Sequence, residues 1–197
     1  MLLYDNPISG NCYKVRLLLA LLGVDYERRE LDVFDRSDRA EVLGELNPGL
    51  RVPTLVLDDG RSLGESGAIL VYLADQTEYI PADRFERAQM LQWMFFEQYS
   101  HEPNIAVLRF WAEAGIEPAA AELAAKRAGG EGALAAMERH LTGRRFFVAD
   151  SYSLADIALY AYTHVAHQGG FALERYPAIG AWIERVAARP GHITIDA

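Results

Sequence analysis

The sequence has little of three things on which many functions depend, namely cysteine, basic charge and long apolar runs. Its one cysteine, Cys12, excludes an intrachain disulfide, a Cys-x-x-Cys redox pair and a cysteine-built zinc cage. The formal net charge of -9 argues against a nucleic-acid partner, because such an interface needs a basic patch or stripe. The five histidines are scattered without metal-ligand spacing, so no metal site is expected.

One apolar run, residues 16–22, superficially resembles a signal peptide because it begins with an arginine. Asp5 and Pro7 precede it, and no small-residue cleavage site follows closely. The run is also too short to span a membrane, so a buried helix is the better interpretation. With one cysteine, the chain suits a reducing cytoplasm, and no membrane partner is expected.

What the sequence does contain is a first region of alternating strand and helix patterns. Its 197 residues are enough to bury a sizeable core, and 51% of them are hydrophobic. The order predicts a mixed sheet covered by helices, as in the thioredoxin-like fold, over residues 1–76. The expected elements are a strand at 2–4, a helix at 12–22, a strand at 26–33, a helix at 38–46, strands at 54–57 and 61–63, and a helix at 66–74.

Strand patterns nearly vanish after a linker predicted at residues 77–83, so residues 84–197 are expected to form an all-helical domain. The fold class is therefore α/β plus all-α. Pro103 should kink or divide a helix over 84–113, and the glycines of 129–132 should break or bend the next helix. Ser153 and Asp156 have the spacing of a helix N-terminal capping box and are expected to be structural.

Two segments of the first region can form a peptide-binding site. Val52-Pro53 opens a strand, where a cis proline would turn the backbone of Val52 outward to pair with an extended peptide. The alternative is a plain edge-strand proline. Glu65-Ser66 opens a helix, whose free N–H groups and dipole favour an anion. The alternative there is an ordinary helix cap. A hairpin turn at 58–60 returns the chain, so both segments should border one cleft.

The pattern Val-Pro-x-Leu followed by Glu-Ser-x-Ala-Ile-Leu resembles the glutathione-binding signature of the glutathione transferase family. The resemblance implies that Val52, beside Pro53, pairs with the cysteinyl unit of glutathione. Ser66 would bind the γ-glutamyl carboxylate, and Glu65 would receive the ammonium group. Arg51 would touch the glycyl end, although a solvated arginine explains it equally well.

The turn Ser9-Gly10-Asn11 would then lie near the glutathione sulfur. Lowering a thiol pKa from ~8.5 to about 6.5 requires roughly 2.7 kcal/mol and raises the thiolate share at pH 7 from ~3% to about 75%. One hydrogen bond to a charged group supplies about 1.5–3 kcal/mol, and a helix N-terminus adds roughly 0.3–1 kcal/mol. Ser9 matches the catalytic serine of theta-like and related bacterial members, and Asn11 is a rival. Cys12 is a further candidate, but its spacing favours a packed core thiol.

For the helical region, the resemblance implies an electrophile pocket and a dimer seam on the first long helices. Its candidate residues include Ile105, which core packing explains equally well. The full set of candidates for this pocket is Tyr99, His101, Asn104 and Ile105.

The expected function is attack by the glutathione thiolate on a small hydrophobic electrophile, as in detoxification, with glutathione as co-substrate and no other cofactor. A homodimer is expected from the resemblance. The alternatives are a glutathione-dependent isomerase, dehalogenase or peroxidase on the same fold, or a non-catalytic glutathione-binding regulatory module. The sequence leaves open the electrophile and the physiological pathway.

Overall fold

The computed structural model describes all residues from Met1 to Ala197 and divides into two compact units. The first unit comprises Met1–Thr77 and Pro190–Ala197, and the second comprises Glu78–Arg189. The sequence assigned the last eight residues to the helical domain, whereas the structure places them in the first unit. Side-chain bonds to backbone carbonyls of this tail hold it there, and such bonds leave no pattern in the sequence.

The first unit contains the expected mixed sheet of four strands. The central strand β1 pairs in parallel with β2 and antiparallel with β3, and β3 pairs antiparallel with β4. The order across the sheet is β2-β1-β3-β4. The strands are β1 (Leu2–Asp5), β2 (Glu27–Glu30), β3 (Thr54–Val56) and β4 (Ser62–Leu63).

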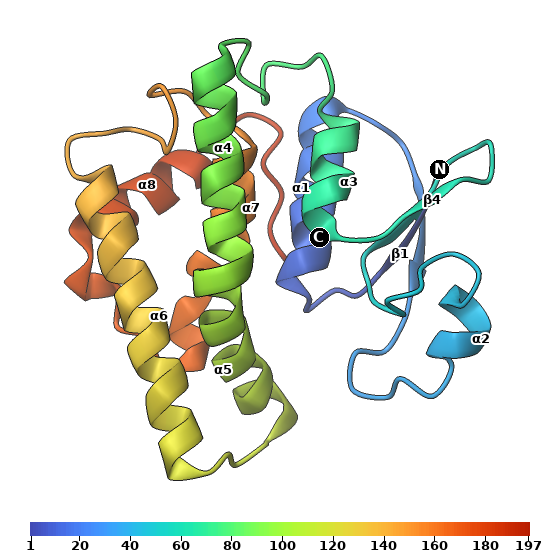
Figure 1. Ribbon diagram of the computed structural model, residues 1–197, viewed down its shortest axis with the longest axis horizontal. Helices are drawn as coiled ribbons and strands as arrows, with labels where there is room; N and C mark the ends of the chain where they lie inside the picture. The colour runs from blue at the N-terminus through green and yellow to red at the C-terminus, as the bar shows by residue number, and fades with distance from the viewer. The chain divides into compact units, whose positions relative to one another are not determined.

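Helices cover both faces of this sheet (Figure 1). Leu3 and Leu55 point from β1 and β3 toward α1 and α3, where they pack with Val15 and Ile69. Tyr4 points to the opposite face and packs with Leu43 of α2. Since alternate strand residues face opposite sides, one short strand serves both cores. The helices are α1 (Gly10–Leu22), α2 (Arg39–Leu43) and α3 (Ser66–Leu73).

The second unit is helical, as the sequence predicted. The expected division near Pro103 is confirmed, because a π-helical turn separates α4 from α5 and Pro103 lies in the first turn of α5, where its missing N–H is tolerated. No helix of the chain has the length and apolarity to cross a bilayer. The helices are α4 (Arg84–Phe96), η1 (Glu97–His101), α5 (Glu102–Ala114), α6 (Ala120–Leu141), α7 (Leu154–Thr163), η2 (Ala166–Gly169), η3 (Leu173–Arg175) and α8 (Pro177–Ala187).

Of the break or bend expected at the glycines of 129–132, the break does not occur, because α6 runs through them without interruption. Two of these glycines lie against neighbouring side chains. A Cβ on Gly129 would come within 2.6 Å of Asn104, and one on Gly130 within 2.3 Å of the Phe171 ring. The glycines therefore allow close packing, and this packing outweighs their low helix propensity.

The predicted capping box of α7 is present and deeply buried. The Asp156 carboxylate accepts hydrogen bonds from the Ser153 N–H at 2.9 Å and the Ser153 hydroxyl at 3.2 Å. It also accepts from the Trp182 ring N–H at 2.9 Å and the Phe147 N–H at 3.2 Å. Burial raises the pKa of Asp156 to about 6. These contacts agree with a structural role for the pair.

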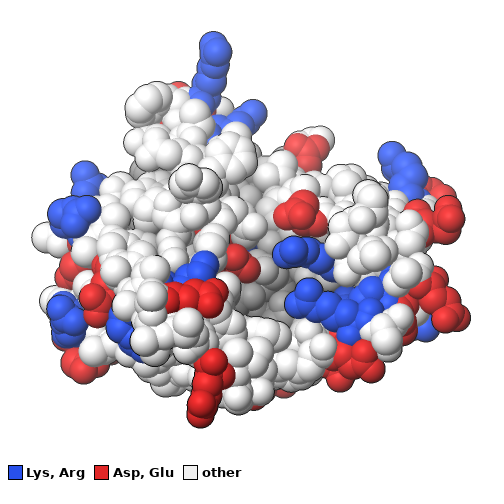
Figure 2. Space-filling model, turned by 60° about the horizontal axis from the view of Figure 1, so that its bottom comes forward, with Lys and Arg blue, Asp and Glu red and all other residues white.

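Charged side chains are interspersed over the face of the molecule that Figure 2 shows. Lys and Arg side chains lie beside Asp and Glu side chains in mixed groups, and wide areas of other residues separate these groups. This face therefore carries no continuous band of one sign.

Candidate functional site

Ser9 is the N-cap of α1, as its position in the sequence indicated. Its backbone is extended, and its Oγ accepts a hydrogen bond from the Cys12 N–H at 3.3 Å. A hydroxyl that accepts one hydrogen bond still carries a proton to donate. Ser9 can therefore cap the helix and donate to an anion at the same time.

The turn that leads into Ser9 is held by Asn6, which the sequence analysis missed. Asn6 is buried; its Nδ2 donates to the Leu31 carbonyl at 2.9 Å, and its Oδ1 accepts from the Ile8 N–H at 3.1 Å. The Ser9 N–H donates to the Asn6 carbonyl at 3.2 Å. Asn side chains often accept a hydrogen bond from the backbone N–H two residues later in a turn. The Asn6-Pro7 pair in the sequence could therefore have indicated this role.

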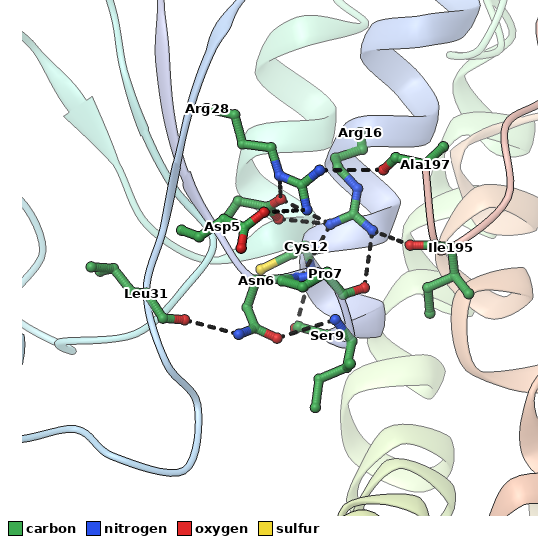
Figure 3. Close-up of polar contacts among 12 residues, drawn as sticks. Asp5, Asn6, Pro7, Ser9, Cys12, Arg16, Arg28, Leu31, Ile195 and Ala197 are labelled. Carbon is green, nitrogen blue, oxygen red and sulfur yellow. Dashed lines mark hydrogen bonds and ion pairs between the residues drawn. The ribbon is translucent and has the colours of Figure 1, made fainter.

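A buried ion cluster lies directly behind this turn (Figure 3). Asp5 is 0% exposed and Arg16 is 1% exposed, and the Arg16 Nη1 donates to both Asp5 oxygens at 2.9 Å. Arg28 pairs with the same carboxylate. Two guanidinium groups thus offset the cost of burying Asp5, and the cluster joins β1, β2 and α1.

Asn11 links the start of α1 to the start of α3. Its Oδ1 accepts from the Lys14 Nζ at 2.7 Å and from the Ser66 Oγ at 3.3 Å. A lysine ammonium is only a donor, so this contact determines which branch of the amide is the oxygen. The amide nitrogen, with its two N–H donors, therefore lies on the other branch. The structure brings Asn11 and Ser66 together across 55 residues of sequence.

Cys12 belongs to the core. Its side chain is fully buried, and burial together with the nearby Asp5 charge raises the pKa of the thiol far above its usual range. A thiol held protonated in this way is a poor nucleophile. The structure agrees with the packing interpretation that the spacing favoured.

The peptide bond between Val52 and Pro53 is cis, as the resemblance implied. The loop before it is held by the side chain of Asn47. The Asn47 Nδ2 donates to the Arg51 carbonyl at 3.0 Å and to the Thr54 hydroxyl at 2.9 Å. Asn47 thus fixes both sides of the Val52-Pro53 bond, while the Arg51 side chain is exposed.

Glu65 and Ser66 do not form the ordinary cap that the sequence left as the alternative. Glu65 occupies the N-cap position without a capping side-chain bond, and its φ of 61° is unusual for a residue other than glycine. Such backbone strain is often found at binding sites. Ser66 is the first residue of α3, and its hydroxyl is directed at Asn11. This helix start is therefore arranged for something other than self-capping.

The four pocket candidates of the second unit do not share one environment. Tyr99 is 87% exposed, whereas His101 is buried with its Nε2 at 2.9 Å from the Thr163 hydroxyl. Asn104 donates to a backbone carbonyl of its own helical segment, and Ile105 is buried beside Gly130. For Ile105, this placement favours core packing, the alternative that the sequence left open.

A mixed four-stranded sheet with a cis proline, followed by an all-helical unit, defines a class of two-domain proteins built on the thioredoxin-like fold. Two family models match the chain: "Glutathione S-transferase, N-terminal domain" over residues 3–81 and "Glutathione S-transferase, C-terminal domain" over residues 89–190. The chain belongs to the glutathione S-transferase family.

Similar proteins span nearly the whole chain. The crystal structure of a glutathione S-transferase from Pseudomonas fluorescens Pf-5 is 46% identical, with a TM-score of 0.94 and 98% of each chain covered. Glutathione S-transferase 2 of Anopheles gambiae is 30% identical over 95% of this chain and 91% of its own length. The disulfide-bond oxidoreductase YfcG of Escherichia coli is 27% identical over 95% of this chain and 90% of its own length.

Proposed function

We propose that the chain is a glutathione transferase that binds glutathione along its first unit and activates the thiol at the start of α1. The observation that carries this proposal is the hydrogen bond from the Ser66 Oγ to the Asn11 Oδ1 at 3.3 Å. It places the predicted carboxylate-binding helix start next to the predicted sulfur-binding turn. One small peptide of about three residues can reach both.

In this arrangement Ser66 and the free N–H groups of α3 bind the γ-glutamyl carboxylate, and the exposed Glu65 receives the ammonium group. Val52 pairs its backbone with the cysteinyl unit, as a strand adds to a sheet edge. Arg51 is placed to contact the glycyl carboxylate.

The sulfur is stabilised as a thiolate by hydrogen bonds from the Ser9 hydroxyl, with the Asn11 amide as the second donor. Ser9 donates from a position that the Cys12 N–H already fixes, and Lys14 orients the amide of Asn11. The chain's own role is to bind glutathione, to lower the pKa of its thiol and to hold it for attack on a soft, small hydrophobic electrophile. We further propose a cytoplasmic homodimer that acts in detoxification.

Titration of glutathione with the ultraviolet absorbance of the thiolate as readout tests this proposal. We expect binding with a pKa of the bound thiol about 2 units below that of free glutathione. Binding without a lowered pKa would favour a non-catalytic regulatory module, and absence of binding would overturn the proposal. Turnover of aryl halides, epoxides, enones and peroxides then separates transferase from isomerase, dehalogenase and peroxidase chemistry.

A further inference from the structure

We infer that the C-terminal tail, Pro190–Ala197, acts through Arg16 to position the turn that holds the glutathione sulfur. This inference rests on the proposed role of the Ser9 turn. The tail and this turn lie at opposite ends of the printed sequence.

Arg16 touches each of the three residues that join β1 to the loop before Ser9 (Figure 3). Besides its bonds to the carboxylate of Asp5, its Nη1 donates to the Asn6 carbonyl at 3.1 Å. Its Nη2 donates to the Pro7 carbonyl at 3.2 Å. A planar guanidinium with several bonds in fixed directions holds this backbone more firmly than a point charge would.

The tail adds one more acceptor to Arg16, whose Nε is buried without a hydrogen-bond partner. The Nη2 that holds the Pro7 carbonyl also donates to the Ile195 carbonyl at 2.6 Å, and the neighbouring Tyr13 hydroxyl donates to the Ile193 carbonyl at 2.7 Å. Loss of the tail replaces the Ile195 carbonyl by water, which accepts from the Arg16 N–H group but does not hold the guanidinium in one direction. The guanidinium then reorients, and the carbonyls that it holds in the turn move with it.

Arg28 provides a contrast within the same cluster. It pairs with Asp5 and Glu30 and donates to the Ala197 carbonyl at 3.3 Å, and these partners lie outside residues 6–9 of the Ser9 turn. It therefore shares the charge and the tail with Arg16 without holding the backbone next to the sulfur. A substitution of Arg28 therefore tests whether the ion cluster stabilises the fold, without removing the bonds that hold the turn before Ser9.

A catalytic hydrogen bond needs its donor placed to within about 0.5 Å. The proposed anchors for the rest of glutathione lie on other segments, at Val52 and at Glu65-Ser66. Loss of the tail contact should therefore change the state of the sulfur while leaving the affinity for glutathione nearly unchanged.

Two shortened chains test the inference. A chain ending at Ile195 keeps an acceptor for Arg16, as its terminal carboxylate, and removes the Arg28 contact at Ala197 and the Ala197 N–H bond to the Thr194 carbonyl. A chain ending at His192 removes the Ile195 and Ile193 carbonyls, which accept from Arg16 and Tyr13 respectively. We expect the first to match the full chain within about 2-fold in kcat. We expect the second to lose about 10-fold in kcat and to raise the pKa of bound glutathione by about 1 unit, with KM for glutathione within about 2-fold.

Arg16→Lys decides the matter if the shorter chain does not fold, as judged by circular dichroism. Lysine keeps a charge for Asp5 but lacks the fork that reaches Pro7 and Ile195, so we expect the same rise in thiol pKa, with Arg28→Lys as the unchanged control. An unaltered thiol pKa in folded Arg16→Lys or in the folded shorter chain overturns the inference alone. A full-length chain that binds glutathione without lowering its pKa overturns the proposed activation, and the inference with it.

Discussion

Each of the two units has a helix that begins at a serine with a buried aspartate nearby. Ser9 opens α1 and Ser153 opens α7, and a buried aspartate lies near each. The aspartate behind Ser9 is paired with two arginine side chains, whereas Asp156 accepts hydrogen bonds only from neutral groups.

This difference separates a candidate site from a structural element. Ser153 is 1% exposed and its hydroxyl donates to Asp156, so it has no route to a solute. Ser9 is only partly buried, and its hydroxyl proton remains available to an external acceptor. In a sequence, a serine near an acidic residue is compatible with a binding site and with a structural helix cap. The burial of the serine in the structure distinguishes the two roles.

The largest expected effect is on the buried cluster of the second unit. Asp156→Ala removes the acceptor of four donors and should lower the free energy of unfolding by on the order of 4 kcal/mol. Urea denaturation followed by circular dichroism measures this change. Ser153→Ala is the milder control, with an expected loss of about 1–2 kcal/mol. A loss below about 1 kcal/mol for Asp156→Ala would contradict the structural role of the cluster.

Ser9→Ala should affect chemistry where Ser153→Ala affects stability. Loss of one hydrogen bond to the thiolate is expected to reduce turnover by about 10- to 100-fold and to raise the pKa of the bound thiol, while glutathione affinity stays nearly intact. Loss of the cap lowers stability by only about 1 kcal/mol. Steady-state kinetics and thiolate absorbance provide the readouts.

Asn11→Ala is the matched comparison for Ser9. If Ser9→Ala retains activity and Asn11→Ala abolishes it, Asn11 is the main thiolate donor and our assignment of Ser9 is wrong.

A third serine at a helix start, Ser66, should show a third pattern. Ser66→Ala and Glu65→Gln are each expected to weaken glutathione binding by about 10-fold. Glu65→Gln removes the charge that pairs with the ammonium group, and Ser66→Ala removes a hydroxyl that turns from Asn11 to the carboxylate when glutathione binds. Isothermal titration calorimetry measures the dissociation constants. Unchanged affinity in both variants would refute the proposed γ-glutamyl anchor.

The last prediction concerns pH. Because the pKa of Asp156 is raised to about 6 in the folded state, above that of an aspartate in the unfolded chain, the folded state holds its proton over a wider range. This contribution to stability is therefore present below about pH 4 and is lost as the pH rises to about 6. Urea midpoints across this range should show the wild-type advantage over Asp156→Asn shrinking as the pH rises. An advantage that grows with pH would contradict the direction of the shift.

The first unit was largely predictable because its signals are local. Strand alternation, the Asp-Asp-Gly turn, Val52-Pro53 and the start of α3 each lie within a few residues, and the order of elements follows from them. The strand expected at 26–33 is shorter in the structure, Glu27–Glu30, because its exposed residues carry no clear alternation.

The rest depended on contacts between distant residues. Arg16 meets a carbonyl 179 residues away, and Ser66 meets Asn11 across 55 residues, and neither pairing has a periodicity that a sequence could display. The glycines of α6 carried a misleading signal, since their close packing against α5 is a tertiary effect. Apolar helix residues such as Ile105 look the same in a sequence whether they line a pocket or fill a core.

The return of the tail to the first unit also has a consequence for how the chain is made. Residues 1–77 are translated before the helical unit, yet the Ile195 carbonyl that accepts a hydrogen bond from Arg16 is translated after it. The first unit thus begins folding earliest and reaches its final form only after the whole helical unit has been translated. A partly made chain would hold the sulfur-binding turn without its last support.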